Sequence, residues 1–173
     1  MTTMKKPPKI ALIGRPNVGK STLFNRFTRS KDAIVAERPG LTRDRRYGEF
    51  SLKGKRAILI DTGGIATDLD DPLSKEVLRQ TELAIKEADL LLLMFDGKEG
   101  LVTDDFILVD MARKSPKPAL AVVNKIDSRE KKLRCVDFYE TGFEPILDIS
   151  AKSGRGLSEL KSQILEILFH PKQ

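Results

Sequence analysis

The chain has 173 residues, of which 40% are hydrophobic and 32% are charged, so it can bury one core and is not composed like a disordered protein. Its 31 basic and 25 acidic residues give a net charge of +6, which favours anionic partners such as phosphate ligands or nucleic acid. No apolar run approaches the roughly 20 residues of a membrane-spanning helix, and the N-terminus lacks a secretory signal, so we expect a cytoplasmic protein without a membrane partner.

Apolar runs of strand length alternate with stretches of helical period along the chain. This alternation predicts an α/β fold with a mostly parallel six-stranded sheet and helices on both faces. We expect strands at residues 9–14, 47–52, 56–61, 90–96, 118–124 and 145–149. The second and third strands form a hairpin, which gives the sheet one antiparallel edge strand. Helices are expected at residues 19–29, 73–88, 133–139 and 157–169, and another from Thr103 or Asp104 to Ser115.

The same pattern predicts a single domain at residues 9–169, after a disordered basic tail at residues 1–8. Residues 30–46 have few apolar anchors and no clear period, so we expect a mobile loop there. Residues 170–173 look like the beginning of an interdomain linker.

The clearest motif runs from Gly14 to Ser21, where GRPNVGKS fits the phosphate-binding pattern G-x-x-x-x-G-K-[ST] between a strand and a helix. Backbone N–H groups would surround the phosphates, Lys20 would reach the terminal ones, and the Ser21 hydroxyl would ligate magnesium. Taken alone, the loop indicates a nucleoside triphosphate or similar phosphate ligand, with a chance match as the alternative. The nucleotide-binding residues expected here are Gly14, Asn17, Val18, Gly19, Lys20, Ser21 and Thr22.

A second motif, Asp61-Thr62-Gly63-Gly64, ends the third predicted strand. Asp61 could hold magnesium through water, and the N–H of Gly64 could donate to a γ-phosphate. In isolation the segment could equally be an ordinary strand-to-helix turn, since Asp and Gly favour such turns. A Cys/His zinc cluster is not expected, because the chain has one cysteine and one histidine.

Two further segments follow strands and point to the base of the nucleotide. In Asn124-Lys125-Ile126-Asp127, the Asp127 carboxylate could accept from N1–H and the exocyclic amine of guanine, a donor pair that adenine lacks. In Ser150, Ala151 and Lys152, backbone amides could support the base. The first segment alone could be surface polarity after a strand. The two segments together predict GTP and GDP as ligands.

These motifs in this order resemble the translation-factor-related branch of small GTP-binding proteins, which implies a P-loop GTPase fold. Residues 14–26, 39–44, 61–65 and 136–139 narrow the resemblance to the first GTPase domain of the bacterial Der (EngA) family of ribosome-assembly GTPases. The resemblance implies that Thr42 reaches magnesium when GTP is bound. It also implies a second GTPase domain and a KH-like RNA-binding domain in the intact protein, with the ribosome or rRNA as partner. Since this chain has one phosphate loop, we expect an excised first domain.

The expected catalytic residues are Lys20, Thr42, Gly64 and Asn17. Many small GTPases place a glutamine after Asp-x-x-Gly to orient water, but this chain has Ile65, so we expect slow intrinsic turnover. Related potassium-activated GTPases carry an asparagine where this chain has Asn17. We therefore expect potassium as an activating cofactor beside magnesium, with Asn17 as its ligand. The alternative is that Asn17 only hydrogen-bonds to backbone.

Three classes of function stay open at this point. The leading one is a GTP-hydrolysing switch in ribosome biogenesis, specifically large-subunit assembly. The second is a guanine-nucleotide sensor with negligible hydrolysis, and the third is an RNA-binding module, which the 6% aromatic content disfavours. The phosphate loop also resembles that of GTPase domains in tRNA-modification or iron-transport proteins, which stay as further alternatives. Arg43, Arg45 and Arg46 could offset charge in the transition state, contact phosphate or RNA, or be solvated.

Overall fold

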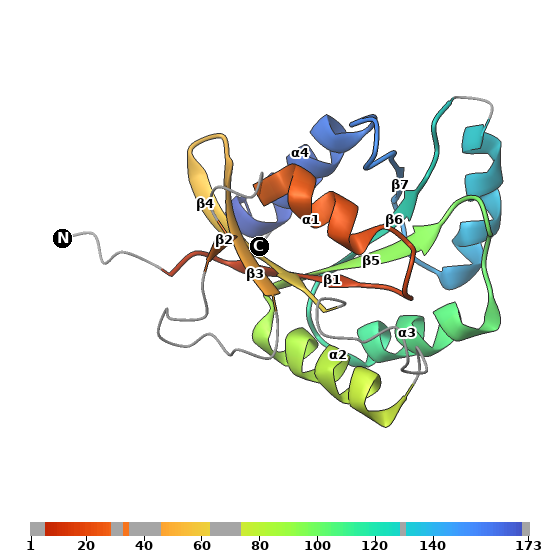
Figure 1. Ribbon diagram of the computed structural model, residues 1–173, viewed down its shortest axis with the longest axis horizontal. Coiled ribbons are helices and arrows are strands. Elements are labelled where there is room, and N and C mark those ends of the chain that lie inside the picture. The colour runs from red at the N-terminus through yellow and green to blue at the C-terminus, as the bar shows by residue number, and fades with distance from the viewer. Residues whose placement is uncertain (1–5, 29–32, 35–45, 63–73, 129–130, 171–173) are drawn as a thin grey trace.

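The computed structural model describes residues 6–28, 33–34, 46–62, 74–128 and 131–170, and within them a seven-stranded sheet carries helices on both faces (Figure 1). The strand order is β2-β3-β4-β1-β5-β6-β7. The strands are β1 (Lys9–Ile13), β2 (Ala33–Ile34), β3 (Arg46–Leu52), β4 (Lys55–Asp61), β5 (Leu90–Asp96), β6 (Ala119–Asn124) and β7 (Ile146–Asp148). The helices are α1 (Lys20–Thr28), α2 (Lys75–Glu87), α3 (Thr103–Lys114), the 3-10 helix η1 (Lys131–Thr141) and α4 (Leu157–Phe169).

The sheet is mostly parallel, as the sequence pattern predicts. β4, β1, β5, β6 and β7 pair in parallel, whereas β3 runs antiparallel to β4 through the hairpin. The six expected strands and the antiparallel strand are confirmed. One feature is added: β2 pairs antiparallel with β3 and forms the outer edge, within the stretch expected to be a loop. Two residues are too short to show a period in the sequence, which is why this strand was not predicted.

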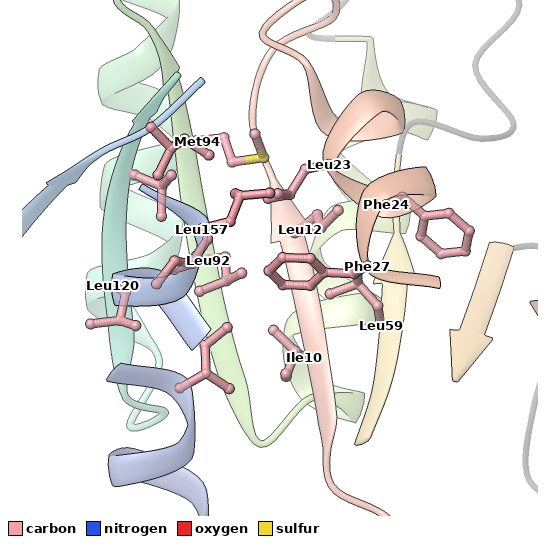
Figure 2. Packing of buried hydrophobic residues seen from close by; sticks show 14 of the residues in the cluster. Ile10, Leu12, Leu23, Phe24, Phe27, Leu59, Leu92, Met94, Leu120 and Leu157 are labelled. Carbon is pink, nitrogen blue, oxygen red and sulfur yellow. The ribbon is translucent and has the colours of Figure 1, made fainter. Parts of the chain in front are cut away.

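Two apolar layers, one on each face of the sheet, hold the fold together. Alternation along β1 sends Ile10 and Leu12 toward α1 and α4, where Leu23 and Leu157 meet them (Figure 2). It sends Ala11 and Ile13 toward α2 and α3 on the opposite face (Figure 1). All seven residues of β5 are buried, because this strand lies in the middle of the sheet with a layer on each side.

The beginning of α3 differs from the prediction. We expected Thr103 or Asp104 to cap this helix, but the N-cap residue is Val102 and no side chain caps from that position. Instead, the Asp105 carboxylate in the first turn accepts from the Val102 N–H at 2.9 Å. A carboxylate here also lies favourably in the field of the helix dipole.

The remaining expectations concern the helix at residues 133–139, the two chain ends and the loop at residues 30–46. The short helix expected at residues 133–139 is the 3-10 helix η1, which is longer at both ends. Residues 1–5, most of residues 30–46, and residues 171–173 lie outside the described residues, so the expected tail, loop and linker are not tested. None of the described helices is long and apolar enough to cross a membrane.

Gly48 in β3 provides a test of how closely α1 packs on the sheet. A Cβ at this position would lie 2.7 Å from the Phe24 ring and would overlap the Thr28 methyl group. We expect Gly48→Ala to lower the free energy of unfolding by about 1–3 kcal/mol, measured by urea denaturation, because overpacking forces α1 and β3 apart. The control, Ser51→Ala at an exposed position of the same strand, should change it by less than about 0.5 kcal/mol. Equal stability of the two variants would contradict this packing.

Candidate nucleotide-binding site

The predicted site residues of the described segments gather at one edge of the sheet. β1, β4, β6 and β7 are parallel, so the segments that leave their carboxyl ends lie next to one another. This edge is where open α/β sheets bind ligands. It receives the phosphate loop after β1, Asp61 at the end of β4, Asn124 at the end of β6, and Ser150 just beyond β7.

Two glycines let the phosphate loop pack against its neighbours. A Cβ on Gly14 would lie 2.8 Å from the Met94 carbonyl oxygen and 2.8 Å from a methyl group of Val18. Gly19 has φ of +109°, and a Cβ there would overlap the side-chain amide of Asn124. The loop can therefore adopt this shape only with glycine at both positions. Val18 is buried between them in sequence, while Thr22 on the first turn of α1 is exposed.

Lys20 is buried by its own loop. The side chain is 7% exposed, and its ammonium group donates to the carbonyl of Gly14 and, at 2.9 Å, to that of Arg15. Burial lowers the pKa of Lys20 to about 8, with the Arg15 cation acting in the same direction and the Asp61 carboxylate opposing it. The lysine is still mostly charged at neutral pH, so it can attract a polyphosphate.

Ser21 and Asp61, both predicted magnesium ligands, lie together. The Ser21 hydroxyl donates to an Asp61 carboxylate oxygen at 3.3 Å, and Asp61 is fully buried at the end of β4. A hydroxyl and a carboxylate are the hard oxygen donors that magnesium takes in proteins beside water and phosphate oxygens, so this pair fits the ion. The described residues contain no cluster of three or more His, Cys, Asp or Glu side chains that would hold a metal alone.

Arg46, one of the three arginines considered for catalysis, lies beside Ser21 and Asp61. Its guanidinium is 3.9 Å from the Asp61 carboxylate, lies 4.2 Å from the centre of the Phe24 ring, and donates to the Asn25 side chain at 2.6 Å. Arg43 and Arg45, and the predicted site residues Thr42 and Gly64, lie outside the described residues.

Asn124 joins three of the predicted segments in one place. Its side-chain amide donates to the Val18 carbonyl at 2.9 Å, and its side-chain oxygen accepts from the Ala151 N–H at 2.9 Å. The residue is 3% exposed, so both polar ends need these partners. The phosphate loop and the segment at residues 150–152 are thereby fixed to the end of β6.

Lys125 links the base-recognition segment to the phosphate loop from the solvent side. Its ammonium group donates to the Asn17 carbonyl at 2.8 Å and to the Asp96 carboxylate at 2.7 Å. Burial alone would raise the pKa of Asp96, but hydrogen bonds from Lys125 and from the N–H groups of Glu99 and Lys98 outweigh it and lower that pKa. Asp96 was not among the predicted site residues, although its position at the carboxyl end of a central strand was a signal for it.

Asp127, the predicted guanine-reading residue, is exposed at this edge. One of its carboxylate oxygens accepts from the Ser150 hydroxyl at 3.0 Å, which brings two predicted segments into contact. Arg26 of α1 supports the second segment, since it donates to the carbonyls of Ala151 at 2.9 Å and Lys152 at 2.7 Å. Sequence reasoning missed this role of Arg26, because nothing in a helical period shows which loop a helix end faces.

Comparison with known proteins agrees with this geometry. A family model described as 50S ribosome-binding GTPase matches residues 9–125, a stretch that includes the phosphate loop, Asp61 and Asn124. The chain belongs to this family. GTPase Der of Marinobacter nauticus is 49% identical over 158 residues, which are 91% of this chain and 33% of that protein. The predicted resemblance to Der GTPases is thus confirmed, and the chain spans about a third of the length of the curated relatives it matches.

Solved structures of GTPases share the fold. The structure of Era in complex with MgGDPNP and nucleotides 1506–1542 of 16S ribosomal RNA aligns with a TM-score of 0.74 at 31% identity, covering 93% of this chain and 56% of that one. The G domain of the T. maritima FeoB iron transporter aligns with a TM-score of 0.66 at 32% identity, covering 93% of this chain and 98% of that one. The predicted P-loop GTPase fold is confirmed by these similarities.

The lowered pKa of Lys20 leads to a pH dependence of nucleotide binding in this GTPase domain. Phosphates stabilise the charged lysine, so GDP binding near pH 8 should take up a fraction of a proton and GDP affinity should fall as the pH rises from 7 to 8.5. Calorimetry in two buffers of different ionisation enthalpy measures the uptake. Lys20→Arg is the control, because arginine stays charged throughout this range. Absence of uptake in the parent, or equal uptake in both proteins, would contradict the assignment.

Proposed function

We propose that this domain is a GTP-binding and GTP-hydrolysing switch that acts in ribosome biogenesis, in assembly of the large subunit. The observation that carries the proposal is the double hydrogen bond of Asn124, which joins the phosphate loop to the segment proposed to support the base. A site that binds phosphate alone would not need the hydrogen bond between Asn124 and Ala151. Membership of the 50S ribosome-binding GTPase family supports the biological setting.

Guanine recognition is assigned to Asp127, with Asn124, Lys125, Ser150, Ala151 and Lys152 as the other residues around the base. The contact from the Ser150 hydroxyl orients the Asp127 carboxylate at the exposed edge. A carboxylate in this position can accept two hydrogen bonds from N1–H and the exocyclic amine of guanine, an adjacent pair of donors that adenine lacks. The site should therefore discriminate strongly between the two purines.

Replacing Asp127 tests the choice of base. We expect Asp127→Asn to weaken GDP binding by about 100-fold or more, because the charged carboxylate that accepts both guanine donors is lost. The variant should gain affinity for xanthosine diphosphate, whose additional carbonyl pairs with the new amide. Titration calorimetry with both nucleotides measures the change, and Asp137→Asn, an exposed carboxylate on η1, is the control. Unchanged GDP affinity in the Asp127 variant would remove this assignment.

For hydrolysis, we assign charge neutralisation to Lys20 and to magnesium held by Ser21 and Asp61. When bound, magnesium supplies positive charge to the β- and γ-phosphate oxygens. Thr42 is proposed as the loop residue that reaches the metal with GTP, and the Gly64 N–H as a donor to the γ-phosphate. Intrinsic turnover should be slow, because Ile65 stands where a glutamine would orient the attacking water.

Potassium is the proposed activating cofactor, with Asn17 as its ligand. Asn17 is exposed, its φ is +71°, and its side chain makes no hydrogen bond to any described residue, which leaves the amide oxygen accessible. A role of the Asn17 side chain as a potassium ligand is therefore favoured over a role in hydrogen bonding to the backbone. An amide oxygen with phosphate oxygens could hold a monovalent cation and offset charge between the β- and γ-phosphates.

Turnover at constant ionic strength, with potassium exchanged for sodium, tests this cofactor. We expect GTP hydrolysis by the parent to be at least about tenfold faster in potassium, as one additional charge near the β–γ bridge would allow. Asn17→Ala should lose the difference between the two salts, and its GDP affinity is measured alongside to separate binding from turnover. Equal rates in both salts for the parent would reject potassium, and stimulation that survives in the variant would reject Asn17. Absence of product in single-turnover assays in either salt would favour the alternative of a nucleotide sensor.

The proposed partners follow from the relatives. GTPase Der is about three times as long as this chain. On the resemblance to Der GTPases, a second GTPase domain and a KH-like RNA-binding domain are proposed for the intact protein. Ribosome or rRNA contact is proposed by analogy with the Era complex containing 16S ribosomal RNA. The higher identity to Der than to the FeoB G domain favours ribosome assembly over a transport role, and the cytoplasm is the proposed location.

A further inference from the structure

Arg15, the second residue of the phosphate loop, does not face the site. Its Nε donates to the Asp105 carboxylate in the first turn of α3 at 2.8 Å, and its Nη1 lies 3.4 Å from the Glu99 carboxylate. The Arg15 side chain is 11% exposed and the Asp105 side chain 1% exposed, so this ion pair is largely removed from water. Burial opposes the charge of Arg15, but Asp105 and Glu99 outweigh it and raise the arginine's pKa.

The partner carboxylate is itself held in place. One oxygen of Asp105 accepts from Arg15 and the other accepts from the Val102 N–H at 2.9 Å. Asp105 therefore cannot turn toward or away from the phosphate loop without releasing the beginning of α3. The first turn of α3 thus fixes the Arg15 guanidinium.

A second contact from the same region reaches the phosphate loop two residues further on. Asp96 accepts from the Glu99 N–H at 3.1 Å with one oxygen and from Lys125 at 2.7 Å with the other, and Lys125 donates to the Asn17 carbonyl at 2.8 Å. The phosphate loop is therefore held on both sides of Pro16, by Asp105 and Glu99 at residue 15 and by Lys125, itself paired with Asp96, at residue 17.

The backbone of Arg15 leads directly to the phosphate-binding lysine. The Arg15 carbonyl accepts from the Lys20 ammonium at 2.9 Å, next to the Gly14 carbonyl. Any movement of residue 15 displaces an acceptor that fixes Lys20. Arg15 Nη2 is buried without a hydrogen-bonding partner in the described part of the chain, a desolvation cost that an apolar residue would avoid.

We propose that the Arg15–Asp105 ion pair is a positioning contact that holds the phosphate loop, and through the Arg15 carbonyl the Lys20 ammonium, ready for the phosphates of the nucleotide. The proposal rests on the proposed GTP-binding function. Its chemical logic is preorganisation: a loop fixed before binding does not lose that freedom when the ligand arrives. The pair should therefore act on affinity, whereas in the bound state the phosphates themselves hold Lys20.

A double-mutant cycle tests the pair. Arg15→Met, Asp105→Asn and the double variant are compared with the parent for binding of fluorescent GDP, for GTP turnover and for thermal unfolding. We expect each single variant to weaken GDP binding about tenfold, with kcat at saturating GTP within about twofold of the parent. The double variant should lose no more affinity than either single one, because both changes remove the same contact. Arg15→Lys keeps the charge and should recover part of the affinity.

Glu87→Gln is the matched control for a merely structural role. Glu87 forms a partly buried ion pair with Lys9 at 3.4 Å, at the opposite end of β1 from the phosphate loop. This variant should lose thermal stability without a change in GDP affinity. If the Arg15 and Asp105 variants also lose only stability, or if their affinity losses add, the proposal is overturned. A parent protein that does not bind GDP would instead overturn the proposed function.

Discussion

The buried amide of Asn124 is the interaction on which the candidate site depends. An amide has a donor and an acceptor at opposite ends, so it can join two backbone segments that have no other reason to approach each other. Here the donor meets the phosphate loop after β1 and the acceptor meets the segment after β7. Because the side chain is removed from water, losing either partner would leave an unpaired buried group, which costs roughly 1–3 kcal/mol. Both loops are thereby held at fixed separation.

The charges around this centre follow a common rule. Lys20 has two backbone carbonyls, Asp61 has the Ser21 hydroxyl, and Lys125 has Asp96. An isolated buried charge is strongly unfavourable, so the buried Lys20 and Asp61 need such partners in the folded chain. The partners of Lys20 are neutral carbonyls, and because an ammonium group has three N–H donors, a phosphate could bind Lys20 beside them. Lys20 therefore keeps its charge within the fold and can still bind an anion.

Much of this arrangement follows from periodicity and motif spacing. The uninterrupted apolar run of β5 is typical of a central strand, and the spacing of the glycines, Lys20 and Ser21 indicates a loop between strand and helix. The two-residue strand β2 had no period to detect. The beginning of α3 was misassigned, because the carboxylate that caps it belongs to Asp105, three residues after the N-cap. The capping preference of Thr and Asp therefore predicted a suitable type of residue, but at position 103 or 104 instead of 105.

Contacts between distant segments were beyond local patterns altogether. Asp127 and Ser150 were each singled out, but their hydrogen bond depends on how β6 and β7 pair. Arg26, Asp96 and the pairing of Arg15 with Asp105 were missed for the same reason, since each role exists only once the strand order is known. A sequence states which residues can form such contacts, and the topology decides which of them meet.

The distances along the chain between these partners have a consequence for folding. Asn124 contacts a residue 106 positions earlier, and Arg26 contacts one 125 positions later. Closing such long loops is slow and entropically costly, so we expect these contacts to form late, when the strands from β1 to β7 are in register. A nucleotide that binds only the completed site draws the whole folding equilibrium toward the native state by mass action. In a cell, the nucleotide would then stabilise only those chains in which β7 has already joined the sheet.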